Sequence, residues 1–165
     1  MKVVTNITPD DCWNFTKYNI RYDSKAKFKF YTNVIAIIFL VAFISFLDFE
    51  SMEQVILQII LSIPMSYCLM LFFMKLGIKK FSKRNEGIIG EHSIEISEEG
   101  VREITKVNDS LSLWNGITKI KQDDSYIYIY IKEFEAHIIP KKSFKSEEEA
   151  NSYFNDALKY WKKEM

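Results

Sequence analysis

The chain has 165 residues with 22 basic and 22 acidic side chains, so its formal net charge is zero. Residues 85–165 are net negative, and binding to nucleic-acid phosphates needs a basic surface, so we expect no nucleic acid partner. The neutral average hides a segmented chain. Residues 85–165 carry 11 basic and 16 acidic side chains, whereas residues 31–74 contain no Lys or Arg. Each segment therefore has to be interpreted by itself.

The N-terminal segment, residues 1–29, predicts a strand followed by a helix. Residues 2–7 are rich in β-branched side chains, as strands are. Thr8 suits the N-cap position of the helix, and Pro9 suits its first turn. Aromatic side chains lie on one side of this helix, so it either lies in a membrane interface or packs on a cytosolic domain. The sequence leaves both arrangements open, and it does not decide whether the strand joins the C-terminal domain.

Two apolar runs, residues 31–47 and 52–74, dominate the middle of the chain. A membrane-spanning helix needs about 20 mostly apolar residues, and both runs are near that length. Buried core helices are the alternative, but a chain of 165 residues is too small to cover both runs on all sides. Residues 30–75 are therefore predicted to form a transmembrane helical hairpin.

Basic residues flank the predicted hairpin on its two outer sides, and the short connection between the runs has none. Cytoplasmic flanks are enriched in Lys and Arg, so we expect both termini in the cytoplasm. The flanking side chains are also candidates for contact with anionic lipid headgroups. They are Lys25, Lys27, Lys29, Lys79, Lys80, Lys83 and Arg84.

The second apolar run carries a polar stripe. Gln54, Gln58 and Ser62 recur every four residues, and Ser62 and Ser66 have the spacing of small residues at close helix contacts in lipid. The stripe indicates contact with the first helix of the hairpin. The alternative is that these four residues form the seam of a homodimer.

Residues 85–165 alternate short strand-like segments with turns. Strands are expected at residues 91–97, 101–106, 110–114, 117–121, 126–132 and 136–140. A helix follows, with a Ser-x-x-Glu capping box from Ser146 to Glu149. Together with residues 2–7, this is the element count of a pleckstrin-homology-like barrel. The predicted fold class is an α+β membrane protein, with a transmembrane hairpin and a small antiparallel β-barrel closed by a C-terminal helix.

Three stretches of the C-terminal segment carry a family resemblance. They are residues 90–105 (GEHSIEISEEGVREIT), 110–131 (SLSLWNGITKIKQDDSYIYIYI) and 136–154 (AHIIPKKSFKSEEEANSYF). The segment resembles the C-terminal domain of the YcxB-like family, which are small bacterial membrane proteins of unknown function with two membrane spans. Its most specific pieces are Trp114 with Ile117 and Ile120, and the turn at Pro140. The resemblance implies a protein of the bacterial cytoplasmic membrane, and it implies no catalytic residue.

The strand at residues 126–132 alternates tyrosine with isoleucine. The isoleucines are expected to face the domain interior, so the tyrosines lie either under the N-terminal helix or on an exposed aromatic binding surface. A structural role in the core is the alternative for the same residues. The candidate interaction surface consists of Tyr126, Tyr128, Tyr130, Lys141, Lys142 and Lys145.

No sequence motif indicates a reaction. Cys12 and Cys68 fall in different segments and are not expected to pair, and His92 and His137 stand alone on strand-like segments. We therefore expect no catalytic residues, no metal and no cofactor. The main hypothesis is a membrane-anchored module that binds a protein or peptide at the inner leaflet. The alternatives are a sensor of anionic lipid or membrane state and, less favoured, a small transporter or membrane enzyme.

Overall fold

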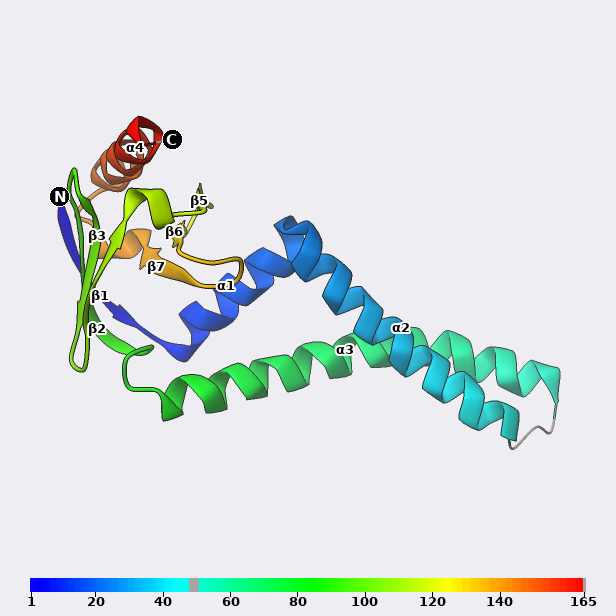
Figure 1. Cartoon of the computed structure of the whole chain (residues 1–165). Helices are drawn as coiled ribbons and strands as arrows, with labels where there is room; N and C mark the ends of the chain where they lie inside the picture. The colour runs from blue at the N-terminus through cyan, green and yellow to red at the C-terminus, as the bar shows by residue number, and fades with distance from the viewer. Residues whose placement is uncertain (48–50, 165) are drawn as a thin grey trace. The chain divides into compact units, whose positions relative to one another are not determined.

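The computed structural model describes residues 1–47 and 51–164, which divide into two compact units. The first unit combines Met1–Phe15 with the segment that begins at Phe81, and the second unit is Thr16–Lys80. Helix α1 (Pro9–Tyr22) begins in the first unit and ends in the second. Figure 1 labels the elements and colours them along the chain.

The first unit contains two antiparallel sheets. One sheet has the order β1-β2-β3-β4, and its strands are β1 (Lys2–Ile7), β2 (Gly90–Ile96), β3 (Gly100–Thr105) and β4 (Asp109–Leu113). The other has the order β5-β6-β7, with β5 (Lys119–Gln122), β6 (Tyr126–Tyr130) and β7 (Ala136–Pro140). The remaining elements are the short 3-10 helices η1 (Trp114–Gly116) and η2 (Lys141–Ser143) and helix α4 (Glu147–Lys163).

Strand β1 joins the C-terminal strands across the long helical insertion. All six of its residues pair with β2, from Lys2 opposite Glu95 to Ile7 opposite Gly90, and Figure 1 shows the two strands side by side. The question left open by the sequence is therefore answered. The prediction of one closed barrel is wrong, because the described strands form two separate hydrogen-bonded sheets of four and three strands.

The core of the first unit lies between the two sheets and α4. Ile94, Ile96 and Val101 of the four-stranded sheet meet Ile127 and Ile129 of β6 in one buried cluster. The isoleucines of β6 thus face the interior, as the alternation predicts. Helix α4 covers the same cluster with side chains that recur at three- and four-residue steps, which gives it one apolar face.

Helix α4 begins with the predicted capping box. The backbone N–H of Glu149 donates to the Ser146 hydroxyl at 3.3 Å. The Glu149 carboxylate accepts from the backbone N–H of Lys145 at 2.7 Å, one residue before the cap. Three glutamates occupy the first turn, where their negative charges interact favourably with the positive end of the helix dipole.

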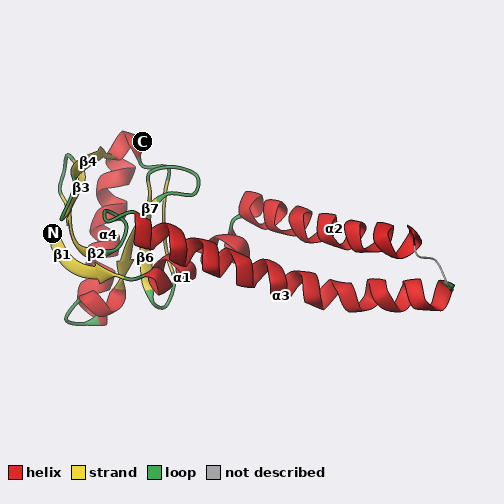
Figure 2. Cartoon of the chain, turned by 90° about the horizontal axis from the view of Figure 1, so that it is seen from below, coloured by secondary structure: helices red, strands yellow, loops and turns green. Residues whose placement is uncertain are grey.

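The second unit contains two long apolar helices, α2 (Ser24–Leu47) and α3 (Met52–Arg84), which run side by side in Figure 2. Both are long and apolar enough to cross a membrane. The Phe30 and Tyr67 rings meet edge to face between them, with centroids 5.5 Å apart. Both helices extend beyond the predicted spans, because the flanking basic segments are also helical.

Candidate functional site

The three tyrosines of β6 lie under the start of α1. Tyr126, Tyr128 and Tyr130 are only 9%, 0% and 1% exposed. The Phe15 ring packs on two of them, with its centroid 5.4 Å from that of Tyr128 and 5.5 Å from that of Tyr130. This corrects the alternative of an exposed aromatic surface, because β6 is covered on both faces. One face meets the core cluster and the other meets the N-terminal helix.

A polar network fastens α1 to β6. The Tyr126 hydroxyl donates to the Asp11 carboxylate at 2.7 Å and accepts from the Asn14 amide at 2.8 Å. The backbone N–H and the hydroxyl of Thr8 both donate to the same carboxylate, at 2.8 and 2.6 Å. Thr8 caps the helix as predicted, because its hydroxyl accepts from the backbone N–H of Asp11 at 3.3 Å. Burial opposes ionisation of Asp11, but the hydrogen bonds from Thr8 and Tyr126 hold its pKa below the usual value. Burial beside Asp11 raises the pKa of Tyr126 to about 12.

The three lysines of the candidate surface lie on and after η2. Lys142 and Lys145 are exposed and Lys141 is half-buried. Between them, the Ser143 hydroxyl donates to the Thr5 hydroxyl of β1 at 2.7 Å. These lysines do not share a surface with the tyrosines, because the tyrosines are buried.

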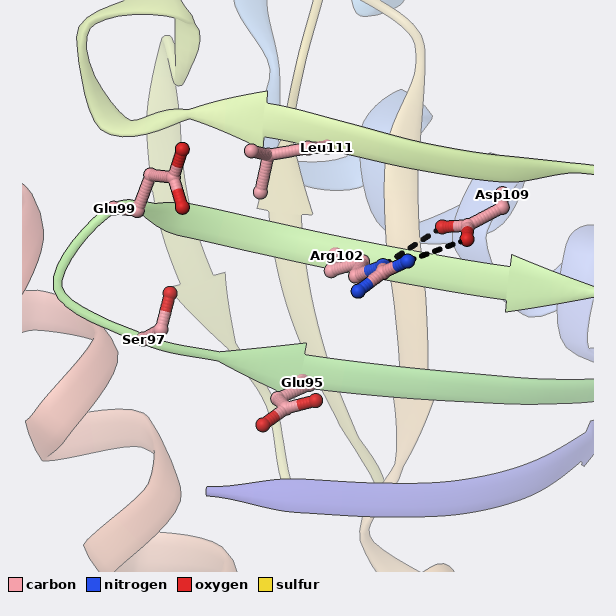
Figure 3. A pocket seen from close by; sticks show the side chains of 6 residues that line it. All are labelled: Glu95, Ser97, Glu99, Arg102, Asp109 and Leu111. Atoms are coloured by element: carbon pink, nitrogen blue, oxygen red, sulfur yellow. Dashed lines mark hydrogen bonds and ion pairs between the residues drawn. The ribbon is translucent and has the colours of Figure 1, made fainter.

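An exposed groove lies on the outer face of the four-stranded sheet, and Figure 3 shows its lining. Leu111 and Leu113 of β4 point outward and are 44% and 47% exposed, whereas Ser110 and Ser112 are half-buried on the inner face. Apolar-inward alternation would place the leucines inside. The groove is lined by Glu95, Ser97, Glu99, Arg102, Asp109 and Leu111.

Acidic side chains outnumber basic ones in the lining of this groove. The Arg102 guanidinium donates twice to the Asp109 carboxylate, from Nε at 2.8 Å and from Nη2 at 2.6 Å. This bidentate pair holds the pKa of Asp109 below its usual value. With Arg102 and Asp109 neutralising each other, Glu95 and Glu99 leave the groove with negative charge. The groove therefore suits a segment that carries basic and apolar side chains.

A second groove lies beside the last turn of α3, and its lining mixes both signs of charge with apolar residues. It is formed by Lys83, Glu86, Ile89, Gly90, Glu91, Ser93, Ile104, Thr105 and Lys106. Lys83 belongs to the predicted lipid-contact residues, and Ile104 belongs to the outer face of the same sheet as Leu111.

The two histidines meet at one carboxylate in the interior of the first unit. Nδ1 of His92 on β2 lies 2.9 Å from Oε1 of Glu103 on β3, and Nδ1 of His137 on β7 lies 3.2 Å from Oε2. Burial opposes ionisation of Glu103, but hydrogen bonds and charge from His137 and His92 hold its pKa at about 2. This corrects the expectation of two isolated histidines. They are 45 residues apart in the sequence, and only the packing of the two sheets brings them together.

The seven basic residues predicted to contact lipid are all exposed on helical ends. They are Lys25, Lys27 and Lys29 in the first turns of α2 and Lys79, Lys80, Lys83 and Arg84 at the end of α3.

The polar stripe of α3 is buried at its two serines and exposed at its two glutamines. Ser62 and Ser66 are 1% and 2% exposed, whereas Gln54 and Gln58 are exposed. On the opposite helix of the hairpin, Phe30 and Val34 are buried as well. The serines therefore occupy a closed face of the hairpin, and the homodimer seam stays a prediction.

The described residues 1–47 and 51–164 contain no group of three or more His, Cys, Asp or Glu side chains placed to hold a metal ion. Cys12 is half-buried and Cys68 is exposed.

Residues 96–155 match the family model described as YcxB-like protein. The matched segment runs from the end of β2 into α4, and it covers a little over a third of the chain. It includes Trp114, Ile117, Ile120 and Pro140, so the resemblance to the YcxB-like family is confirmed. No curated protein matches the chain.

Proposed function

We propose that this chain is a membrane-anchored interaction module of a bacterial cytoplasmic membrane, with α2 and α3 as the transmembrane hairpin and both termini in the cytoplasm. Most apolar side chains of the two helices are exposed, including Phe39, Phe46 and Leu61. In water such a surface is unfavourable, whereas a lipid environment removes the cost. The basic helical ends support the orientation, since Lys and Arg concentrate on the cytoplasmic side.

A topology experiment tests the anchor. Single cysteines are placed at exposed positions on the predicted cytoplasmic side, at Lys27 or Lys80, after Cys12 and Cys68 have been changed to Ser. A membrane-impermeant maleimide applied to intact cells should label neither position, and it should label both after the cells are opened. Labelling of either position in intact cells contradicts the orientation, and extraction of the chain by carbonate contradicts the anchor.

The observation that carries the interaction module is the reversed polarity of β4. This strand is at one edge of its sheet, and it presents Leu111 and Leu113 outward next to a negatively charged groove. An edge strand has backbone groups available for a further strand, and exposed leucines beside it provide apolar contact. We place the interaction surface here, in place of the buried tyrosines, and its partner segment should carry basic and apolar side chains.

The test of this surface uses the full tagged chain in its native membrane. Cells are cross-linked, membranes are solubilised in mild detergent, and captured proteins are identified for wild type, Leu111→Ser/Leu113→Ser and Val4→Ser. Val4 is the matched control, because it is exposed on the same sheet but on the opposite edge strand, β1. A protein captured by wild type and Val4→Ser but lost with the β4 variant supports the surface. Identical captures from all three chains reject it.

A sensor of anionic lipid is the second candidate, and the exposed lysines and arginine at the helical ends favour it. Reconstitution of the full chain in nanodiscs with anionic or zwitterionic lipid tests it through hydrogen exchange. Anionic lipid should protect residues 79–84 in wild type, and replacement of Lys79, Lys80, Lys83 and Arg84 by Gln should remove the difference. Equal protection in the two lipids rejects the sensor.

The proposal also includes a pleckstrin-homology-like arrangement of the first unit and no catalytic activity. A four-stranded and a three-stranded antiparallel sheet followed by one helix support this arrangement. Superposition of an experimental structure on pleckstrin-homology domains tests it. A different connection between the two sheets contradicts the pleckstrin-homology-like arrangement. Turnover of any substrate that is lost on a single substitution contradicts the absence of catalytic activity.

A further inference from the structure

The cluster of His92, Glu103 and His137 joins the two sheets through a single carboxylate. His92 and Glu103 lie on β2 and β3 of one sheet, and His137 lies on β7 of the other. Both imidazoles are only 4% exposed, and each directs Nδ1 at a different oxygen of Glu103. With the carboxylate ionised, both Nδ1 atoms carry a hydrogen and donate it.

The net charge of the His92, Glu103 and His137 cluster depends on how many protons the two imidazoles hold. With both imidazoles neutral the cluster carries the single negative charge of Glu103, and with both protonated it carries one surplus positive charge. One proton shared over the two imidazoles makes the cluster neutral. A buried surplus charge of either sign is costly, so the state with one imidazolium is favoured over both others.

The two imidazoles differ at their second nitrogen. Nε2 of His137 lies 3.5 Å from the Ser112 hydroxyl, which can accept a hydrogen bond when Nε2 is protonated. Nε2 of His92 is buried without a hydrogen-bond partner. Protonation of His92 would add a buried N–H with nothing to accept it. At His137 the Ser112 hydroxyl, which donates to the neutral Nε2, can turn and accept from the protonated one, so a partner is kept.

We propose that His92, Glu103 and His137 form a proton-binding site between the two sheets, in which His137 takes the proton and His92 stays neutral with its hydrogen on Nδ1. The proton sets the net charge of the cluster, in which Glu103 stays ionised and bridges the two sheets through the histidines. Uptake of a second proton in acid places a surplus positive charge between β7 and the four-stranded sheet.

The groups around the cluster leave its charge uncompensated by other residues. Thr5 of β1 opposes His92, Ser110 of β4 opposes Glu103, and Ile129 of β6 opposes His137, and none of these titrates. The charges that act on Glu103 are those of the two imidazoles. The site therefore consists of three titrating groups, with Ser112 as the partner that distinguishes one imidazole from the other.

The test uses the full chain in detergent micelles with ¹⁵N-labelled histidine. The sequence has two histidines, so the spectrum contains two imidazoles, and a His92→Gln variant assigns them. Ring nitrogen shifts distinguish the neutral tautomers from the doubly protonated ring. As the pH is lowered, the wild type should show His137 becoming doubly protonated while His92 keeps the Nδ1–H form. Protonation of His92 ahead of His137, or simultaneous titration of both, overturns the proposal.

Two variants test why the proton goes to the cluster and why His137 takes it in preference to His92. Glu103→Gln keeps the size of the side chain but removes the charge, so the protonation equilibrium of His137 should shift by at least about tenfold toward the neutral ring. Ser112→Ala removes the acceptor at Nε2 and should reduce the preference for His137 over His92. Ser110→Ala is its matched control, since Ser110 is also on the inner face of β4. A Ser112→Ala spectrum that equals the Ser110→Ala spectrum at every pH overturns the assignment, even if Glu103→Gln fails to fold.

Discussion

The first 15 residues should be required for the C-terminal unit to fold, although 65 residues separate the two segments in the chain. The test compares two fragments. One is residues 81–165 alone, and the other is residues 1–15 joined to residues 81–165 through a long Gly/Ser linker. The linked form keeps all of the first unit and omits the apolar helices, so only the presence of β1 and the start of α1 differs between the two fragments.

The expected loss follows from burial. Val3, Ile7, Trp13 and Phe15 are each less than one-tenth exposed. Burying one such side chain contributes about 1.5–3 kcal/mol, so the four contribute about 6–12 kcal/mol together. The whole stability of a domain is about 5–15 kcal/mol. Without these residues β2 also loses its partner strand, and the tyrosines of β6 lose their cover.

Circular dichroism and two-dimensional NMR spectra measure the result. The linked fragment should melt cooperatively with dispersed resonances, and residues 81–165 alone should show neither property. Within the linked fragment, Ile7→Asp should abolish folding and Val4→Asp should not, because Ile7 faces the core and Val4 faces solvent. A cooperative transition of residues 81–165 alone, within a few degrees of the linked fragment, would show that the first 15 residues are not required for folding.

Three further predictions concern single residues in the full chain. Gly100→Ala should destabilise the first unit by about 1–3 kcal/mol in urea unfolding, because a Cβ there overlaps the backbone of β4, whereas Gly116→Ala has open space and should be nearly neutral. Glu103→Gln should cost about 3 kcal/mol at pH 7, since the pKa of the carboxyl is lowered from 4.5 to about 2. A lowered pKa stabilises above pH 4.5, so the difference from wild type should shrink as the pH falls from about 4.5 to 2. Ser62→Leu should lower the melting temperature in detergent more than Ile63→Leu, because Ser62 is buried in the hairpin and Ile63 is exposed.

Most elements could be predicted from local pattern. The second run and its helix both begin at Met52, the first run and its helix both end at Leu47, and the capping box at Ser146 has the predicted backbone hydrogen bond. These features depend on residues within a few positions of one another, so spacing is enough to find them. The helical extension of α3 to Arg84 was missed, because a run of basic residues has no apolar periodicity.

The site could not be predicted in the same way. Strand β6 has the alternation of a half-buried strand, yet all five of its residues are buried because α1 covers the tyrosine face. Cover by a distant segment leaves no signal in the strand itself. The meeting of His92 and His137 at Glu103 likewise depends on how two sheets pack. A buried strand residue with a polar side chain is the one signal that could have drawn attention to the histidines, since such groups need partners.

Strand β4 has serines next to the buried cluster on its inner face and the exposed leucines on its outer face. Glu103 faces inward and is opposed by Ser110 on β4, and the next inward residue of β4, Ser112, contacts His137. A leucine in place of Ser112 would remove the polar partner of His137 from a place where unpaired polar groups are costly. Since side chains alternate along a strand, keeping serines inside puts Leu111 and Leu113 outside. The proton-binding site thus accounts for the polarity of β4 that the proposed interaction surface uses, and the two share this edge strand.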